Sequence, residues 1–147
     1  MRPGYDRARR CSHLPQKTKP CPQVPGGGPG KGALDRMVGE ARHVGKVHNP
    51  SVGLEVFGAM SILADTSKTG GKWDIKNVRD AIGARMYPSG QNFGNFLYGA
   101  TSVGMGFSPG FSDFAADLYS LWDNGTLETQ DAMIRAGQRY AAMGCDQ

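Results

Sequence analysis

Apolar residues recur at helical spacing in four stretches after residue 32, and this period constrains the fold most strongly. Residues three or four positions apart share one face of an α-helix, so each stretch predicts a helix with one buried side. Asn49, Ser108 and Thr126 suit helix N-caps, whereas Gly45 and Gly144 suit C-terminal ends. The stripes are Leu34, Met37, Val38 and Ala41; Val52, Val56, Met60 and Leu63; Phe111, Phe114, Ala115, Leu118, Leu121 and Trp122; and Leu127, Ile134 and Ala141.

The pattern predicts a predominantly α-helical domain of four or five helices. No run of alternating apolar residues is long enough to require a sheet, although aromatic residues around Trp73 and from Phe93 to Tyr98 also suit a small two- or three-stranded element. The segment from Gly90 to Gly106 carries five glycines, and glycine adopts positive φ without steric cost. We expect this segment to be a glycine-rich functional loop across the top of the bundle.

Composition divides the chain near residue 32. Residues 1–32 hold six of the nine prolines, and seven of the 17 Lys and Arg residues against one of the 13 Asp and Glu residues. Such a segment buries little apolar surface and does not keep a helix. We therefore expect a disordered basic tail over residues 1–32 and one domain over residues 33–147. The domain itself is slightly acidic, so its charge alone gives only weak support for nucleic-acid binding.

Three cysteines bear on compartment and metal content. Cys11 and Cys21 stand ten residues apart, with His13 beside the first, and this spacing fits no zinc pattern. The third is Cys145, and an odd count argues against a disulfide framework. The sequence thus predicts reduced thiols, folding in a cytoplasm and no metal site.

No targeting or cofactor signature is visible. No apolar run approaches the roughly 20 residues that cross a bilayer, and the N-terminal residues lack the apolar centre of a secretory signal. The polar segment 65–72 lacks the pattern G-x-x-x-x-G-K-[ST] of a phosphate-binding loop. We expect neither a membrane span nor a cofactor.

Polar and aromatic residues gather at Trp73-Asp74-Ile75-Lys76. In an extended chain Asp74 and Lys76 project to the same side, where a carboxylate and an ammonium group could position a substrate and move a proton. In a helix they diverge, and Asp74 would instead cap a helix from Ile75 to Ile82 while Trp73 fills the core. Both interpretations remain open at this point.

Two asparagines and two histidines are further candidates, and each has both a structural and a functional interpretation. Asn92 and Asn95 either tie their segment to itself or face a ligand, because a buried amide without a partner is costly. Imidazole groups suit general bases, which makes His43 and His48 candidates, but no carboxylate partner stands at a telling spacing. The interpretation of the histidines as surface or turn residues competes with the catalytic one.

Four sequence blocks together resemble a known family. GKWDIKN is followed by NFGNFLYGAT, then by GMGFS and a closing DAMIRAGQRYAAMGC. This order resembles the polymorphic toxin type 44 domain, a C-terminal toxin module of bacterial competition systems, over roughly Val52 to Cys145. The resemblance implies a toxin, and members of the family are predicted to be ribonucleases.

The resemblance also implies roles for individual residues. Asp74, Lys76, Asn95 and Tyr98 stand on marked positions of the family pattern and are the expected catalytic residues. Asp74 would serve as general acid or base, and Lys76 would stabilise a pentavalent phosphate. Metal-independent cleavage through attack of the 2′-hydroxyl is the simplest scheme. The expected substrate-binding residues are Trp73, Asn92, Gly94 and Gly99.

Partners and alternatives complete the expectation. The resemblance implies an RNA substrate, a cognate immunity protein, a monomeric chain, and synthesis in a bacterial cytoplasm before delivery toward a target cell. Two other functions stay open: a hydrolase toxin acting on cell-wall peptidoglycan or another substrate with the same carboxylate, and a degenerate toxin or binding module without catalysis.

Overall fold

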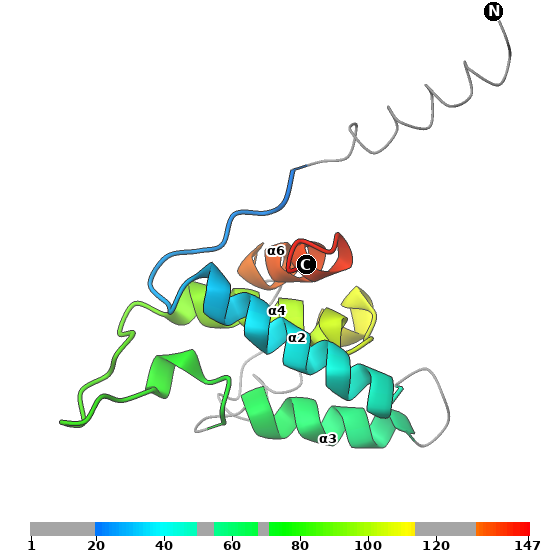
Figure 1. Cartoon of the computed structure of the whole chain (residues 1–147), viewed down its shortest axis with the longest axis horizontal. Coiled ribbons are helices and arrows are strands. Elements are labelled where there is room, and N and C mark those ends of the chain that lie inside the picture. Colours follow the sequence, from blue (N-terminus) through cyan, green and yellow to red (C-terminus); the bar gives the residue numbers. More distant parts are fainter. Residues whose placement is uncertain (1–19, 50–54, 68–70, 114–131) are drawn as a thin grey trace, which may run out of the picture.

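Helices dominate the part of the chain that the computed structural model describes, which is residues 20–49, 55–67, 71–113 and 132–147 (Figure 1). The elements are α2 (Lys31–Val47), α3 (Glu55–Ser67), the 3₁₀ turn η2 (Ile75–Asn77), α4 (Gln91–Gly104) and α6 (Ala132–Ala142). Residues 109–113 are also helical. The predicted α-helical fold is confirmed. In the described residues the possible β element amounts to one isolated antiparallel bridge between Arg79 and Arg85.

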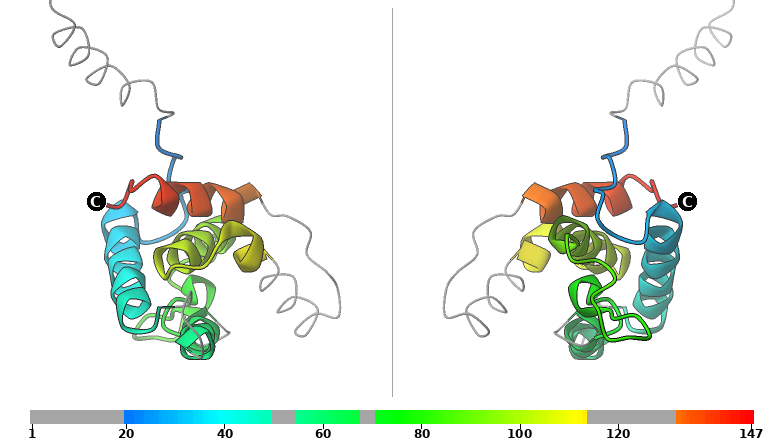
Figure 2. Two further views of the ribbon diagram at one scale, coloured as in Figure 1. Left: turned by 90° about the vertical axis from the view of Figure 1, so that its right-hand side faces the viewer. Right: turned by 90° about the vertical axis from the view of Figure 1, so that its left-hand side faces the viewer.

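The central element is α4, where we expected a loop. Its residues Phe93, Phe96, Leu97 and Ala100 are all buried in the core, and their spacing of i, i+3, i+4 and i+7 is that of a helix face. The helix packs against α6, α2 and η2. Figure 2 shows α6 lying over α4, with α2 at one side. The prediction of a functional loop from Gly90 to Gly106 is therefore wrong.

Two glycines allow α4 and α6 to approach backbone to backbone. A Cβ at Gly99 would overlap the carbonyl oxygen of Ile134, and a Cβ at Gly137 would overlap that of Phe96. Both glycines are buried, and each lies within a helix whose neighbour occupies the space of a side chain. These glycines are thus required by helix packing, although glycine weakens each helix by roughly 0.5–1 kcal/mol relative to alanine.

The predicted helix ends meet mixed outcomes. Ser108 caps as expected, because its Oγ accepts a hydrogen bond from Phe111 N at 3.2 Å, and Gly144 follows α6 with a φ of 73°. Gly45 does not end α2, which continues to Val47 while Gly45 packs against the backbone of Met105. The expected cap at Thr126 lies outside the described residues.

Residues 20–30 form an extended arm at the N-terminal end of α4. A Cβ at Gly28 would overlap the ring of Phe93, and Gly27, with a φ of 84°, lies against the carbonyl of Ser89. Val24 packs on the core. The expected disordered tail of residues 1–32 is therefore too long, because residues 20–32 belong to the folded domain. The expectation for residues 1–19 lies outside the described part.

A disulfide joins this arm to the other end of the chain. Cys21 and Cys145 are bonded with their Cα atoms 5.9 Å apart, across a sequence separation of 124 residues. The prediction of reduced thiols is wrong, since an odd count excludes only complete pairing. Disulfides persist in oxidising surroundings and are rare where thiols are kept reduced, so the state of this bond depends on the surroundings of the chain.

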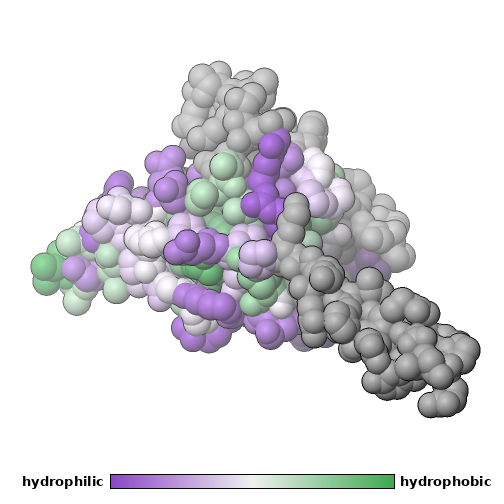
Figure 3. All heavy atoms as spheres, turned by 90° about the horizontal axis from the view of Figure 1, so that it is seen from above, coloured by the Kyte–Doolittle hydropathy of each residue, from purple (hydrophilic) through white to green (hydrophobic). Residues whose placement is uncertain are grey.

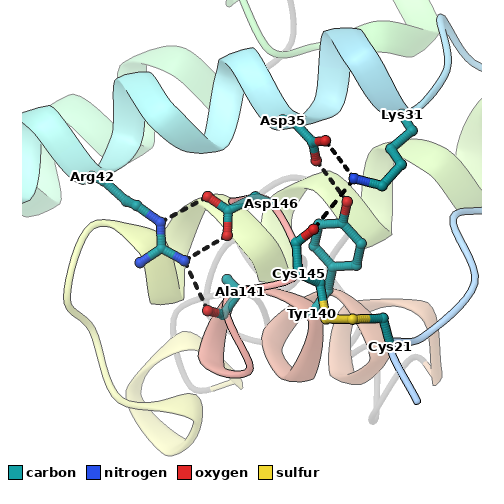
Figure 4. A network of polar contacts seen from close by, with 8 residues as sticks. All are labelled: Cys21, Lys31, Asp35, Arg42, Tyr140, Ala141, Cys145 and Asp146. Carbon is teal, nitrogen blue, oxygen red and sulfur yellow. Dashed lines mark hydrogen bonds and ion pairs between the residues drawn. A yellow bond between two sulfur atoms is a disulfide. The ribbon is translucent and has the colours of Figure 1, made fainter.

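Polar contacts beside the disulfide connect α2 to the C-terminal residues (Figure 4). Lys31 pairs with Asp35 and donates to the carbonyl of Cys145 at 3.3 Å. The hydroxyl of Tyr140 donates to Asp35 at 2.6 Å. Burial, together with this hydrogen bond, raises the pKa of Tyr140. The start of α2 and the end of α6 are thus held at one place.

Seven residues after Asp35 on α2, Arg42 makes a second connection to the C-terminal residues. Its Nε and Nη2 atoms donate to the two carboxylate oxygens of Asp146 at 2.8 and 2.6 Å, and Nη2 also donates to the carbonyl of Ala141 at 2.8 Å. These hydrogen bonds lower the pKa of Asp146 below its usual value. Bidentate pairing of this kind fixes geometry as well as charge.

Residues 78–86 form a hairpin that protrudes from the helices at one end (Figure 1). Asp80 Oδ1 accepts hydrogen bonds from the backbone N–H groups of Ile82 and Ala84, and Gly83 takes a φ of 86° at the tip. Ile82 is 89% exposed, and Figure 3 shows a hydrophobic patch at this end of the molecule.

None of the described helices is long and apolar enough to cross a bilayer.

We predict opposite effects of alanine at two glycines of α4. Gly99→Ala lowers the free energy of unfolding by about 1–3 kcal/mol or more, because the methyl group forces α6 away. Gly94→Ala raises it by about 0.5–1 kcal/mol, because nothing lies within 4 Å of its Cβ position. Urea denaturation of both variants measures the difference. Equal effects would contradict the close helix crossing.

We predict that Cys145→Ser lowers the free energy of unfolding by about 2–4 kcal/mol, the typical effect of losing a disulfide that closes a long loop. Dithiothreitol should lower the Tm of the native chain and leave that of Cys145→Ser unchanged. Cys11→Ser is the matched control and should keep the native response to the reductant. If Cys11→Ser removes that response, Cys11 and not Cys145 forms the stabilising bond.

Candidate functional site

The two segments singled out by the family resemblance lie against each other. The turn η2 carries the Asp74-Lys76 segment and packs on α4, which carries Asn92, Asn95 and Tyr98. Sequence reasoning expected this proximity. It arises because the chain turns back at residues 87–90 between the hairpin and α4, with Gly90 N bonded to Tyr87 O at 3.0 Å.

Asp74 lies at the inner side of this junction. It is only 7% exposed, and one of its oxygens, Oδ2, accepts a hydrogen bond from Asn77 Nδ2 at 2.6 Å. Its side chain makes no capping bond to η2, and Val78 is already extended with a ψ of 129°. The alternative of a helix from Ile75 to Ile82 capped by Asp74 is therefore wrong. Instead, a single 3₁₀ turn holds Asp74 and Asn77 together.

Trp73 belongs to the core. It is 5% exposed, like its neighbour Ile75 at 3%, and its indole Nε1 is buried without a hydrogen-bond partner among the described residues. The ammonium group of Lys72 lies 5.7 Å from the centre of the ring. Of the two interpretations of Trp73, as a substrate-binding residue and as a residue that fills the core, its burial supports the second.

α4 carries several polar residues that solvent can reach. Asn92 is exposed, and Gly94, Asn95 and Tyr98 are half-buried. Gly94, Asn95 and Tyr98 share one side of the helix by their spacing. Among the described residues, no atom outside the backbone of α4 itself lies within 4 Å of the Cβ position of Gly94, which leaves room beside it. Gly99, by contrast, lies in the crossing with α6, so its assignment as a substrate-binding residue is wrong.

Tyr98 connects this face to residues 109–113. Its hydroxyl donates to the carbonyl of Ser112 at 3.1 Å, and the hydroxyls of Ser102 and Ser112 are 2.6 Å apart. Ser112 and Ser102 are completely buried. The tyrosine hydroxyl is thus held in place from behind, which suits a group that positions a ligand.

The side chain of one expected catalytic residue lies outside the described structure, and one residue without an expected role contacts Asp74. Lys76 lies in η2, and its side chain is outside what the structure describes. Asn77 was given no role from the sequence, although its position three residues after Asp74 is the spacing at which side chains meet across a turn. Its Nδ2 donates to Oδ2 of Asp74 at 2.6 Å.

The histidines stand apart from this junction. His43 is exposed on α2, and His48 is the residue that ends α2 and lies beside Gly58 of α3. Within the described ranges no group of three or more His, Cys, Asp or Glu side chains could hold a metal ion. A metal-binding role therefore falls on none of the described clusters.

Comparisons of the chain with protein-family models, with curated proteins and with solved structures found no match. The resemblance to the toxin type 44 domain accordingly rests on the order and spacing of its sequence blocks. The function that it implies is taken up below as a proposal.

We predict different consequences of removing two amides near the junction. Asn77→Ala takes a donor from a buried carboxyl group and lowers the free energy of unfolding by about 1–3 kcal/mol. Asn92→Ala removes an exposed amide, and we expect a change within about 0.5 kcal/mol. Thermal and urea denaturation compare the two. An unaffected Asn77→Ala would mean that Asp74 is satisfied without Asn77.

Proposed function

We propose that this chain is a toxin domain of a bacterial competition system and that it cleaves RNA at the junction of η2 and α4. The observation that supports the proposal is the packing of η2 on α4. This packing brings the segments of the two motifs next to each other, and on α4 Asn92 is exposed while Asn95 and Tyr98 are half-buried.

In the proposed reaction the 2′-hydroxyl of a ribose attacks the adjacent phosphorus. A P–O bond forms to the 2′-oxygen and the P–O bond to the 5′-oxygen breaks, leaving a 2′,3′-cyclic phosphate and a free 5′-hydroxyl. Asp74 takes the proton of the attacking 2′-hydroxyl, and the protonated carboxyl group then returns a proton to the leaving 5′-oxygen. Lys76 offsets the charge that develops on the phosphate.

The burial of Asp74 shapes this mechanism. A carboxyl group that is 7% exposed acts only on an atom brought to the edge of η2, and Asn77 fixes its orientation. Asn95 and Tyr98 would hold the substrate at that edge through an amide and a hydroxyl. Precise placement of this kind contributes to rate by holding reacting atoms in line.

The second candidate is a hydrolase toxin that acts on the bacterial cell wall. The Cys21–Cys145 disulfide favours it, because peptidoglycan lies in the oxidising periplasm where such bonds persist. A toxin bound for the cytoplasm also passes through oxidising surroundings during delivery. In both cases we propose that the producing cell carries an immunity protein and that the chain acts as a monomer.

The deciding experiment uses the purified, oxidised full chain and a short RNA, alongside the same RNA with one 2′-deoxy nucleotide. We expect cleavage of the first, protection at the deoxy position, and no effect of added EDTA. Asp74→Asn should lower kcat by about 10²–10⁴, the usual contribution of a general acid or base. Glu40→Gln is the matched control, since Glu40 pairs with Lys72 on an exposed surface.

Purified peptidoglycan serves as the alternative substrate in the same assay. Release of soluble fragments without RNA cleavage would replace the ribonuclease proposal by the wall hydrolase. Inactivity on both substrates, with a Tm unchanged by Asp74→Asn, would identify a binding module without catalysis.

A further inference from the structure

An open pocket lies between residues 109–113 and α6, outside the proposed catalytic junction. Its volume is about 360 Å³, within the range of pockets that hold small ligands. Two of its residues are exposed arginines of α6. The lining consists of Pro109, Asp113, Arg135, Gln138, Arg139 and Ala142.

Hydrogen bonds build the floor of this pocket in advance of any ligand. Gln138 is 4% exposed, and its Nε2 donates to Asp113 Oδ1 at 2.7 Å and to the carbonyl of Pro109 at 3.3 Å. From the other side, Tyr98 of α4 donates to the carbonyl of Ser112. Residues 109–113 are therefore fixed between two helices, and a ligand meets a preorganised wall.

The charges of the pocket select a class of ligand. Arg135 and Arg139 stand four residues apart, a spacing that puts both residues on one face of α6. Guanidinium groups bind phosphate through paired hydrogen bonds. Asp113 places a carboxylate beside them, which opposes a bare anion and favours one that also offers a hydroxyl or amino group. A nucleotide carries both kinds of group.

We infer that this pocket binds one nucleotide unit of an RNA strand, with a phosphate on Arg135 and Arg139 and a ribose hydroxyl or base amino group on Asp113. The inference rests on the proposed ribonuclease function for its choice of RNA. Continuity with the junction supports it, because Tyr98 contacts Ser112, the residue next to Asp113. A strand that meets Tyr98 can follow residues 109–113 to α6.

The test compares two double variants of equal charge change. In the Asp74→Asn full chain, a fluorescent single-stranded RNA is titrated over a series of salt concentrations. Arg135→Gln with Arg139→Gln should weaken binding at least tenfold and reduce the slope of log K against log salt by about 0.7, the contribution of one phosphate contact on a single strand. Arg79→Gln with Arg85→Gln, two exposed arginines of the 78–86 hairpin, should leave Kd within twofold.

A second measurement tests the ligand class. Adenosine monophosphate should displace the RNA from the pocket more effectively than inorganic phosphate, and Asp113→Asn should remove that difference. Equal weakening by both double variants would show non-specific attraction and overturn the inference. Equal competition by inorganic phosphate would overturn the nucleotide assignment.

The outcome separates this inference from the ribonuclease proposal. RNA bound at α6 but not cleaved by the native chain leaves the pocket standing and removes the catalytic role. RNA cleaved with an unchanged KM in the Arg135→Gln, Arg139→Gln variant leaves the ribonuclease standing and removes the pocket.

Discussion

The contact on which the structure depends is the crossing of α4 and α6 at Gly99 and Gly137. Because neither residue has a side chain, each helix meets carbonyl groups of the other directly. Helices packed so closely cannot shift along each other without steric overlap, since interiors are filled to nearly crystalline density. The neighbours of the two glycines are therefore also fixed: Tyr98 precedes Gly99, and Gln138 follows Gly137. Both side chains bond to residues 109–113 from opposite helices.

A second constraint holds the two ends of the chain against this crossing. The disulfide, the contacts of Lys31 and the pairing of Arg42 with Asp146 all tie the residues after α6 to α2 or to the arm before it (Figure 4). A chain of this size buries a limited fraction of its surface, so covalent and bidentate links contribute a large share of its marginal stability. Oxidation state and stability are consequently coupled.

Local pattern predicted those elements in which local and tertiary preferences agree. In α2 the apolar stripe of Leu34, Val38 and Ala41 is buried, and the cap at Ser108 is present. In α4 the two disagree: its glycines favour a loop by propensity, whereas the crossing with α6 requires a glycine at residue 99 in mid-helix. The helical spacing from Phe93 to Ala100 carried the correct signal. Pairing of Cys21 with Cys145 depends on the tertiary fold, which cysteine parity does not encode.

For the candidate site, the motifs indicated which two segments lie near each other but not which of their side chains are buried. Asp74 and Trp73 lie inside, while Asn95 and Tyr98 are half-buried, because burial of one side of η2 is decided by its packing on α4. The net charge of residues 33–147 is slightly negative. For the proposed RNA substrate, attraction to this domain therefore depends on local groups of cations held at a fixed place. On α6, Arg135 and Arg139 supply such a group beside a wall that Tyr98 and Gln138 hold rigid, so a bound strand would be drawn toward the face of α4 where the polar residues are accessible.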